Sequence, residues 1–188
     1  MVKISGLPKD SAPTANDYIP VLDADTGILK KVLLSDLFNI ATVSASLMSN
    51  PYKFRAKQSV SQAIPHATTT KATFTSEDFD TSNNYNTSTS TFTAPVAGFY
   101  DVMALIKWAS ISGSGSGHMQ VYKNGSAFID VSDFNSAGYT VMFVNDQIQL
   151  AQGDTVNIYV YQGSGVTVNT QVDAINVSYF GMKLSSKT

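Results

Sequence analysis

Short segments in which apolar and polar residues alternate fill the chain from about residue 53 to its end. Glycine-rich or polar sequences separate these segments, as they separate the strands of all-β proteins. Many short strands at this spacing predict an antiparallel sandwich or barrel. The expected strands are 54–60, 67–74, 89–93, 99–108, 118–122, 128–131, 139–150, 155–161, 166–170 and 175–184.

Three glycine-containing sequences predict where the chain turns. Asn124-Gly125 favours a two-residue hairpin, because both central residues of the mirror-image turn need a positive φ. Gly153-Asp154 is typical of a second tight hairpin. The Gly-Ser sequence 113–117 lacks the lysine and the following helix of a phosphate-binding loop, so we expect a flexible loop tip there.

The expected strand 99–108 is apolar on both faces over its central part. One face carries Phe99, Met103 and Leu105, and the other carries Tyr100, Val102, Ala104, Ile106 and Trp108. An antiparallel strand of this kind needs a cover on each side. A second sheet supplies one cover. For the other we expect a second copy of the chain, with loops folded over a thick monomeric core as the alternative.

Residues 1–50 differ in character from the rest and predict a separate arm, whereas residues 51–188 form the head. Two short strands are expected on either side of the turn 24–27, and Ser35 begins a short helix that runs toward Met48. An arm with so few large apolar side chains cannot bury enough surface to be stable alone. We interpret it as an anchor that folds on a partner, with a flexible leader as the alternative.

Composition narrows the classes of function. Twelve basic against 14 acidic residues give a net charge of −2 and a pI near 5.5, so no general basic field attracts nucleic acid. The absence of cysteine excludes disulfides and thiol nucleophiles. No apolar run reaches the roughly 20 residues of a membrane helix. The start of the sequence lacks the apolar core of a secretion signal, so we expect synthesis in a cytoplasm.

Catalytic chemistry finds little support in the residues. Neither His66 nor His118 lies in a metal-binding or nucleophile motif. Glu77, Asp78 and Asp80 lack the spacing of a calcium loop, and we expect them to form a solvated acidic turn. The sequence therefore predicts no enzyme activity, no cofactor and no bound metal.

Aromatic residues near polar loops are candidates for binding a ligand. Trp108, Tyr139 and Tyr161 each combine apolar area with a polar group, which suits stacking on a sugar. The alternative for each is a place in the core or in a contact between copies.

The head resembles the C1q-like branch of the C1q/TNF-like jelly rolls. The resemblance rests on motifs that follow one another in the expected order over residues 53–188. Their residues are Phe92, Pro95, Gly98, Tyr100, Gly153, Asp154, Phe180 and Gly181. It implies an antiparallel two-sheet jelly roll that forms a tight homotrimer. The sequence departs from the family pattern at Asp101-Val102, where the family usually continues with aromatic residues.

The arm is similar to the N-terminal leaders of tailed-bacteriophage fibre and appendage proteins. The residues that carry this similarity are Ile4, Leu7, Pro8, Tyr18, Ile19, Pro20 and Val21. It implies a structural virion protein, a head or tail fibre or a decoration protein, that is anchored by the arm to other virion proteins. The trimeric head would then face a bacterial surface glycan or protein. The alternative is a free-standing carbohydrate- or ligand-binding module.

Overall fold

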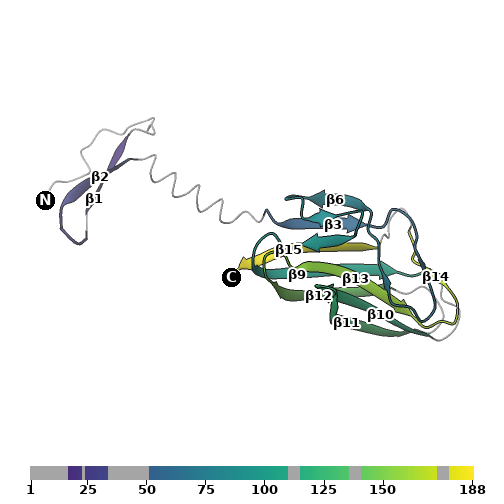
Figure 1. Cartoon of the computed structure of the whole chain (residues 1–188). Helices are drawn as coiled ribbons and strands as arrows, with labels where there is room; N and C mark the ends of the chain where they lie inside the picture. Colours follow the sequence, from purple (N-terminus) through teal and green to yellow (C-terminus); the bar gives the residue numbers. More distant parts are fainter. Residues whose placement is uncertain (1–16, 23, 34–50, 110–114, 136–140, 173–177) are drawn as a thin grey trace. The chain divides into compact units, whose positions relative to one another are not determined.

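Alternation with a period of two makes the C-terminal part of the chain a sandwich of two antiparallel sheets (Figure 1). The computed structural model describes residues 17–22, 24–33, 51–109, 115–135, 141–172 and 178–188. The chain divides into two units, Met1–Ser49 and Asn50–Thr188. The described residues contain no helix, and the helix expected from Ser35 lies outside them.

The first sheet has five strands in the order β12-β9-β15-β3-β6, and all neighbours are antiparallel. In that order the strands are Val141–Leu150, Gly98–Lys107, Tyr179–Lys187, Lys53–Lys57 and Ser76–Asp80. The long strand β9 therefore lies between β12 and β15, and β15 is the central strand.

The second sheet has the order β11-β10-β13-β8-β7, and β5 also pairs with β13. Its strands are Ser126–Asn135, Gly115–Lys123, Thr155–Gln162, Thr91–Thr93, Tyr85–Asn86 and, for β5, Thr70–Lys71. The short strands β4 and β14 pair with each other and span Ala63–Ile64 and Val168–Asn169. These layers show the two-sheet jelly roll that the sequence predicts.

Aromatic rings from both sheets meet in the core. Phe54 of β3 stacks on Tyr85 and Phe92 of the other sheet, with ring centroids 4.5 and 5.2 Å apart. Phe180 of β15 meets the Phe54 ring edge-on at 5.0 Å. Such pairs add about 1 kcal/mol each to the free energy gained from burying their area.

The hydroxyl groups of two core tyrosines have acceptors close by. The Tyr85 hydroxyl donates to the Phe74 carbonyl at 2.9 Å, and burial raises the pKa of Tyr85 to about 12. The Tyr100 hydroxyl donates to the Val96 carbonyl at 2.8 Å. Because each hydroxyl has a partner, the rings can be buried without the cost of an unpaired donor.

Two glycines of the predicted motifs lie where another backbone passes closely. A Cβ at Gly181 would come within 3.0 Å of the Phe54 carbonyl oxygen, and one at Gly98 within 2.4 Å of the Ser186 carbonyl oxygen. β15 can therefore pack tightly against β3 and β9 only without side chains at these positions.

The structure corrects three expectations about local elements. Residues 77–80, expected as an acidic turn, belong to the edge strand β6, because Asp78 pairs with Arg55 and Lys57 of β3. The Gly-Ser sequence is not all loop, since β10 begins at Gly115. The short strands β4 and β7 have no counterpart among the predicted strands.

The N-terminal unit contains a hairpin of β1 (Tyr18–Leu22) and β2 (Leu29–Leu33), which are the two strands expected around the turn. Its apolar side chains stay exposed: 57% of Tyr18 and 71% of Leu29 are accessible. A lone two-stranded hairpin is only marginally stable in water. Its described part therefore has no core of its own.

We predict that Phe54→Ala lowers the free energy of unfolding by about 3–5 kcal/mol, because it leaves a cavity between the two sheets. Urea denaturation at fixed protein concentration measures the change. Phe128→Ala is the control, since Phe128 is 57% exposed and its loss should change stability by no more than about 0.5 kcal/mol. Equal losses for the two variants would contradict the central role of Phe54.

Candidate functional site

The outer face of the five-stranded sheet carries the second apolar side of the predicted two-sided strand. Along β9, residues alternate between buried and half-buried over the whole strand. The side chains that point into the sandwich are covered by the second sheet. Those that point away, including Met103 and Leu105, remain half-buried in the single chain.

Neighbouring strands extend this face. Phe143 of β12 and Tyr179 of β15 both pair with Leu105, and 47% of Phe143 is exposed. Because Gly181 has no side chain, a hollow of about 280 Å³ opens beside Met103 and the exposed ring of Phe79. We call the surface formed by Phe79, Met103, Leu105, Phe143 and Tyr179 the apolar face.

Paired charges border the apolar face. Arg55 and Lys57 both contact Asp78, and the Arg55 guanidinium lies 4.5 Å from the centre of the Tyr179 ring. The hydrogen bond from Lys57 lowers the pKa of the Asp78 carboxyl, although burial acts in the opposite direction. Each carboxylate here is thus balanced by a cation.

Asp101, the departure from the family pattern, lies on this same outer side of β9. Its carboxylate contacts Lys183 of β15 at 3.3 Å and accepts a hydrogen bond from Gln147 of β12 at 3.1 Å. The acidic residue therefore joins three adjacent strands, and its charge does not stand alone in the apolar face.

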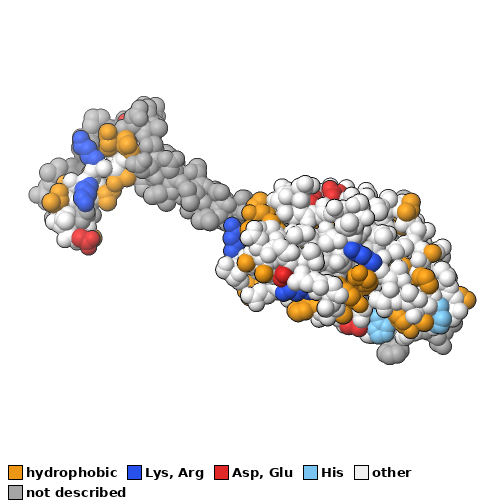
Figure 2. Space-filling model, in the orientation of Figure 1, with side chains coloured by type: hydrophobic (Ala, Val, Ile, Leu, Met, Phe, Trp, Pro, Cys, Tyr) orange, Lys and Arg blue, Asp and Glu red, His pale blue; other side chains and the backbone are white. Residues whose placement is uncertain are grey.

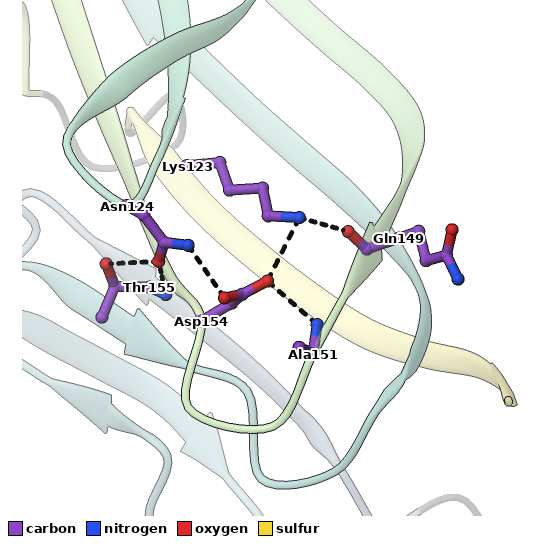
Figure 3. Close-up of polar contacts among 6 residues, drawn as sticks. All are labelled: Lys123, Asn124, Gln149, Ala151, Asp154 and Thr155. Carbon is purple, nitrogen blue, oxygen red and sulfur yellow. Dashed lines mark hydrogen bonds and ion pairs between the residues drawn. The ribbon is translucent and has the colours of Figure 1, made fainter.

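A second polar cluster locks two turns together at one end of the sandwich (Figure 3). Asn124 and Gly125 have φ values of 51° and 80°, as the predicted two-residue turn requires. The Asn124 amide donates to Asp154 at 2.8 Å, and its oxygen accepts from the Thr155 backbone N–H at 2.8 Å. Lys123 reaches both the Asp154 carboxylate at 3.1 Å and the Gln149 carbonyl at 2.9 Å.

The Asp154 carboxylate is the centre of this turn lock. Hydrogen bonds from Asn124 and from the Ala151 backbone N–H lower the pKa of Asp154, with burial acting weakly against them. The network holds the β10–β11 and β12–β13 turns against each other. The turn lock therefore has a structural role, because Lys123 and Asp154 already interact with partners inside the cluster.

A third cluster on the outer face of the other sheet brings together His118, Asp130 and Ser132. His118 Nδ1 lies 3.1 Å from Asp130 Oδ1 and 3.0 Å from Ser132 Oγ. In a Ser-His-Asp relay the serine and the acid contact opposite ring nitrogens. Here both contact the same nitrogen, so the three groups cannot pass a proton from the serine to the far side of the ring.

The structure places the predicted ligand-binding residues very differently. Trp108 is only 1% exposed, so its ring takes the place in the core that was the alternative to ligand binding. The large Trp108 ring fills the space between the two sheets just after the end of β9. Tyr161 is half-buried on β13, 5.5 Å from the His118 ring. Tyr139 lies outside the described residues.

The predicted motif residues of the head are distributed between core and turns. Phe92, Tyr100 and Phe180 are buried in the aromatic core, and Pro95 follows the end of β8. Gly153 has a φ of 88° in the turn that precedes β13.

The predicted anchor residues fall partly within the structure. Tyr18, Ile19, Pro20 and Val21 lie in β1 and are exposed, whereas Ile4, Leu7 and Pro8 lie outside the described residues.

Sequence reasoning missed that Tyr122, Tyr159 and Gln120 share one outward face with His118. The alternation within 118–122 and 155–161 places each residue on an outward face, but alternation alone does not say which strands are neighbours. The register β10–β13 supplies that information, because it sets Gln120 opposite Tyr159.

Within the part of the chain that the structure describes, no three His, Asp or Glu side chains gather closely enough to hold a metal ion. The same residues include no helix that is long and apolar enough to cross a membrane.

Comparisons with known proteins agree with this architecture. The family model of the C1q domain matches residues 53–180. The globular domain of zebrafish complement 1qA protein has a similar structure, with a TM-score of 0.55, 19% sequence identity and coverage of 74% of this chain and all of that one. The Eiger TNF of S. frugiperda has a TM-score of 0.56 at 11% identity, with coverage of 74% and 96%. No curated protein sequence matches the chain.

We predict that the turn lock makes stability depend on acid. Asp154 binds its proton less readily when folded, so its contribution is complete above the ordinary aspartate pKa of 3.8 and is lost as pH falls below that value. Asp154→Asn should lower stability by about 1–3 kcal/mol near neutral pH. Thermal unfolding from about pH 6 to pH 3 should therefore show a smaller acid loss in this variant than in the wild type.

Asp146→Asn is the matched control, because Asp146 is an exposed carboxylate of β12 outside the turn lock. This variant should keep the acid dependence of the wild type. An Asp154→Asn protein whose melting temperature falls with pH as steeply as the wild type would show that the lock carries no such linkage.

Proposed function

Since the chain belongs to the C1q domain family over residues 53–180, we propose that it acts as a homotrimeric binding module without catalytic activity. C1q/TNF domains commonly form homotrimers, and C1q domains are generally non-enzymatic binding modules. The observation that carries the proposal for this chain is the apolar face, which the single chain leaves uncovered.

The shape of the apolar face favours a closed ring of copies. Phe143 and the exposed Val141 project from β12 at one edge of the sheet, whereas the hollow over Gly181 lies beyond β9, toward the opposite edge. A projection and a hollow at different places on one surface suit a head-to-tail contact between copies. Such contacts form a closed ring when the rotation from one copy to the next is a whole fraction of a full turn. In the proposed trimer, Phe143 of each copy enters the hollow of the next.

The arrangement around His118 supports the absence of catalysis in this proposal. Its Nδ1 faces both Ser132 and Asp130, so the cluster offers no activated nucleophile. Binding through shape and repeated weak contacts then remains as the mode of action.

At a finer level, we propose that the module belongs to a phage virion as a fibre or decoration protein, with residues 1–50 as its attachment arm. The exposed hairpin of β1 and β2 supports this idea, because its apolar side chains need a partner surface to be covered. The similarity of the arm to phage fibre leaders is the second support. Trimers presented on a particle would bind a bacterial surface with high avidity even through weak single sites.

We predict that Phe143→Lys converts the trimer into folded monomers, because a cation in the hollow of the next copy would be buried beside Lys53, Arg55 and Lys183. Mass photometry at about 50 nM, below the Kd of a weakened contact, measures the species present. Phe128→Lys is the control, since Phe128 is similarly exposed but belongs to the other sheet, and it should remain trimeric. A wild-type protein that is a stable monomer at this concentration overturns the proposed trimer.

We predict that removing residues 1–40 leaves the trimeric head intact but abolishes its incorporation into particles of the phage that encodes it. The double variant Tyr18→Asp and Val21→Asp should act in the same direction, because it places charges on the exposed hairpin. Western analysis of purified particles measures occupancy. Full occupancy after truncation contradicts the anchor and favours a free-standing module.

A further inference from the structure

The outer face of the six-stranded sheet carries an array of aromatic and polar side chains that the proposed trimer does not use. Cross-strand register sets Tyr161 opposite His118, Tyr159 opposite Gln120, and Gln120 opposite Asp130. Tyr122 follows two residues after Gln120 and therefore points to the same side. We call these six residues of β10, β11 and β13 the aromatic–polar face.

The rings of this face form two closely spaced groups. The centroids of Tyr122 and Tyr159 lie 4.0 Å apart with an angle of 31° between their planes. The rings of His118 and Tyr161 lie 5.5 Å apart, close to edge-on. All four rings are half-buried, so their positions are set by packing while part of each ring stays accessible.

Planar polar groups lie between and beside the rings. The Gln120 amide donates to Asp130 Oδ2 at 2.8 Å, and His118 Nδ1 lies near Asp130 Oδ1. These bonds orient the amide and the carboxylate, yet 44% of the Asp130 side chain is still exposed. The face thus presents fixed acceptors and donors next to fixed rings.

We infer that the aromatic–polar face binds a neutral oligosaccharide. The C–H side of a pyranose ring is apolar and stacks on an aromatic face, while the hydroxyls at its edge both donate and accept hydrogen bonds. Tyr122 and Tyr159 would supply the stacking surface, and Asp130 and Gln120 would form hydrogen bonds with the sugar hydroxyls. This inference names the ligand class for the proposed binding module and therefore rests on that function.

The charges of the surface favour a neutral sugar over nucleic acid or an acidic polymer. A phosphate or uronate would meet the Asp130 carboxylate, whose described contacts are with His118, Gln120 and Ser132. Lys71 of β5 lies opposite Tyr159 and donates to Thr91, so this one cation balances the carboxylate and gives the face no excess positive charge. Figure 2 shows mostly uncharged side chains on the face of the C-terminal unit that it displays, with few lysines or arginines. A protein interface would instead have a continuous apolar centre, whereas here rings and polar groups alternate.

The location of the face suits repeated binding. It lies on the opposite side of the sandwich from the apolar face, so trimer formation would leave a copy exposed on each subunit. Three weak sugar sites on one rigid trimer bind a repetitive polysaccharide far more tightly than one site does.

The test uses the full chain on an array of immobilised neutral oligosaccharides that covers hexoses and N-acetylhexosamines, followed by calorimetry with each soluble oligosaccharide that binds. Tyr122→Ala and Tyr159→Ala should each weaken binding at least about tenfold, which equals about 1.4 kcal/mol. Tyr159→Phe and Gln120→Ala keep the sheet intact and should lose less than the alanine variants of the tyrosines. Circular dichroism confirms that each variant is folded.

Tyr18→Ala is the matched control, because Tyr18 is an exposed tyrosine in the other unit and its removal should leave sugar affinity unchanged. The Phe143→Lys monomer separates this inference from the trimer: calorimetry should give it the same affinity per site as the wild type. Binding by this monomer supports the sugar site even if the wild type is not trimeric. No binding to any array member at about 1 mM, binding that both tyrosine variants retain, or capture of a protein by the same face overturns the inference.

Discussion

The stacking of Phe54 between the two sheets is the contact on which the rest of the molecule depends. Phe54 comes from β3, whereas Tyr85 and Phe92 come from the opposite sheet, so their rings fix the separation and alignment of the layers. Gly181 allows β15 to approach the Phe54 backbone, which draws the central strands together. With the inner faces matched in this way, every outward residue has a defined neighbour across the strands.

This constraint creates two outer faces with contrasting chemistry. The five-stranded sheet presents Leu105, Phe143 and Tyr179 beside a hollow, and its charges are paired at the border. The six-stranded sheet presents rings that alternate with an amide and a carboxylate. Covering the apolar face with a matching apolar surface lowers the free energy. The aromatic–polar face instead keeps its hydrogen bonds to water until a polar ligand replaces them.

Patterns that act within one strand or one turn could be predicted from the sequence. The two-sided strand at β9, the Asn124-Gly125 turn and the jelly roll itself depend on local alternation, on φ preferences and on ordered motifs. β6 could not be predicted, because its acidic residues become strand-like only when Arg55 and Lys57 neutralise Asp78 across the ladder. For a related reason the sequence left two places open for Trp108, since a strand end next to a loop suits either exposure or the core until the opposite sheet is placed.

The bonds around Asn124 also bear on how the protein ages. An asparagine followed by glycine is prone to deamidation, in which the glycine backbone nitrogen attacks the side-chain carbonyl carbon and expels ammonia. Here Thr155 holds the side-chain oxygen and Asp154 holds the amide nitrogen. The side chain is thereby kept out of the cyclic geometry that the reaction needs, so the sequence that makes the β10–β11 turn is also protected from slow chemical damage.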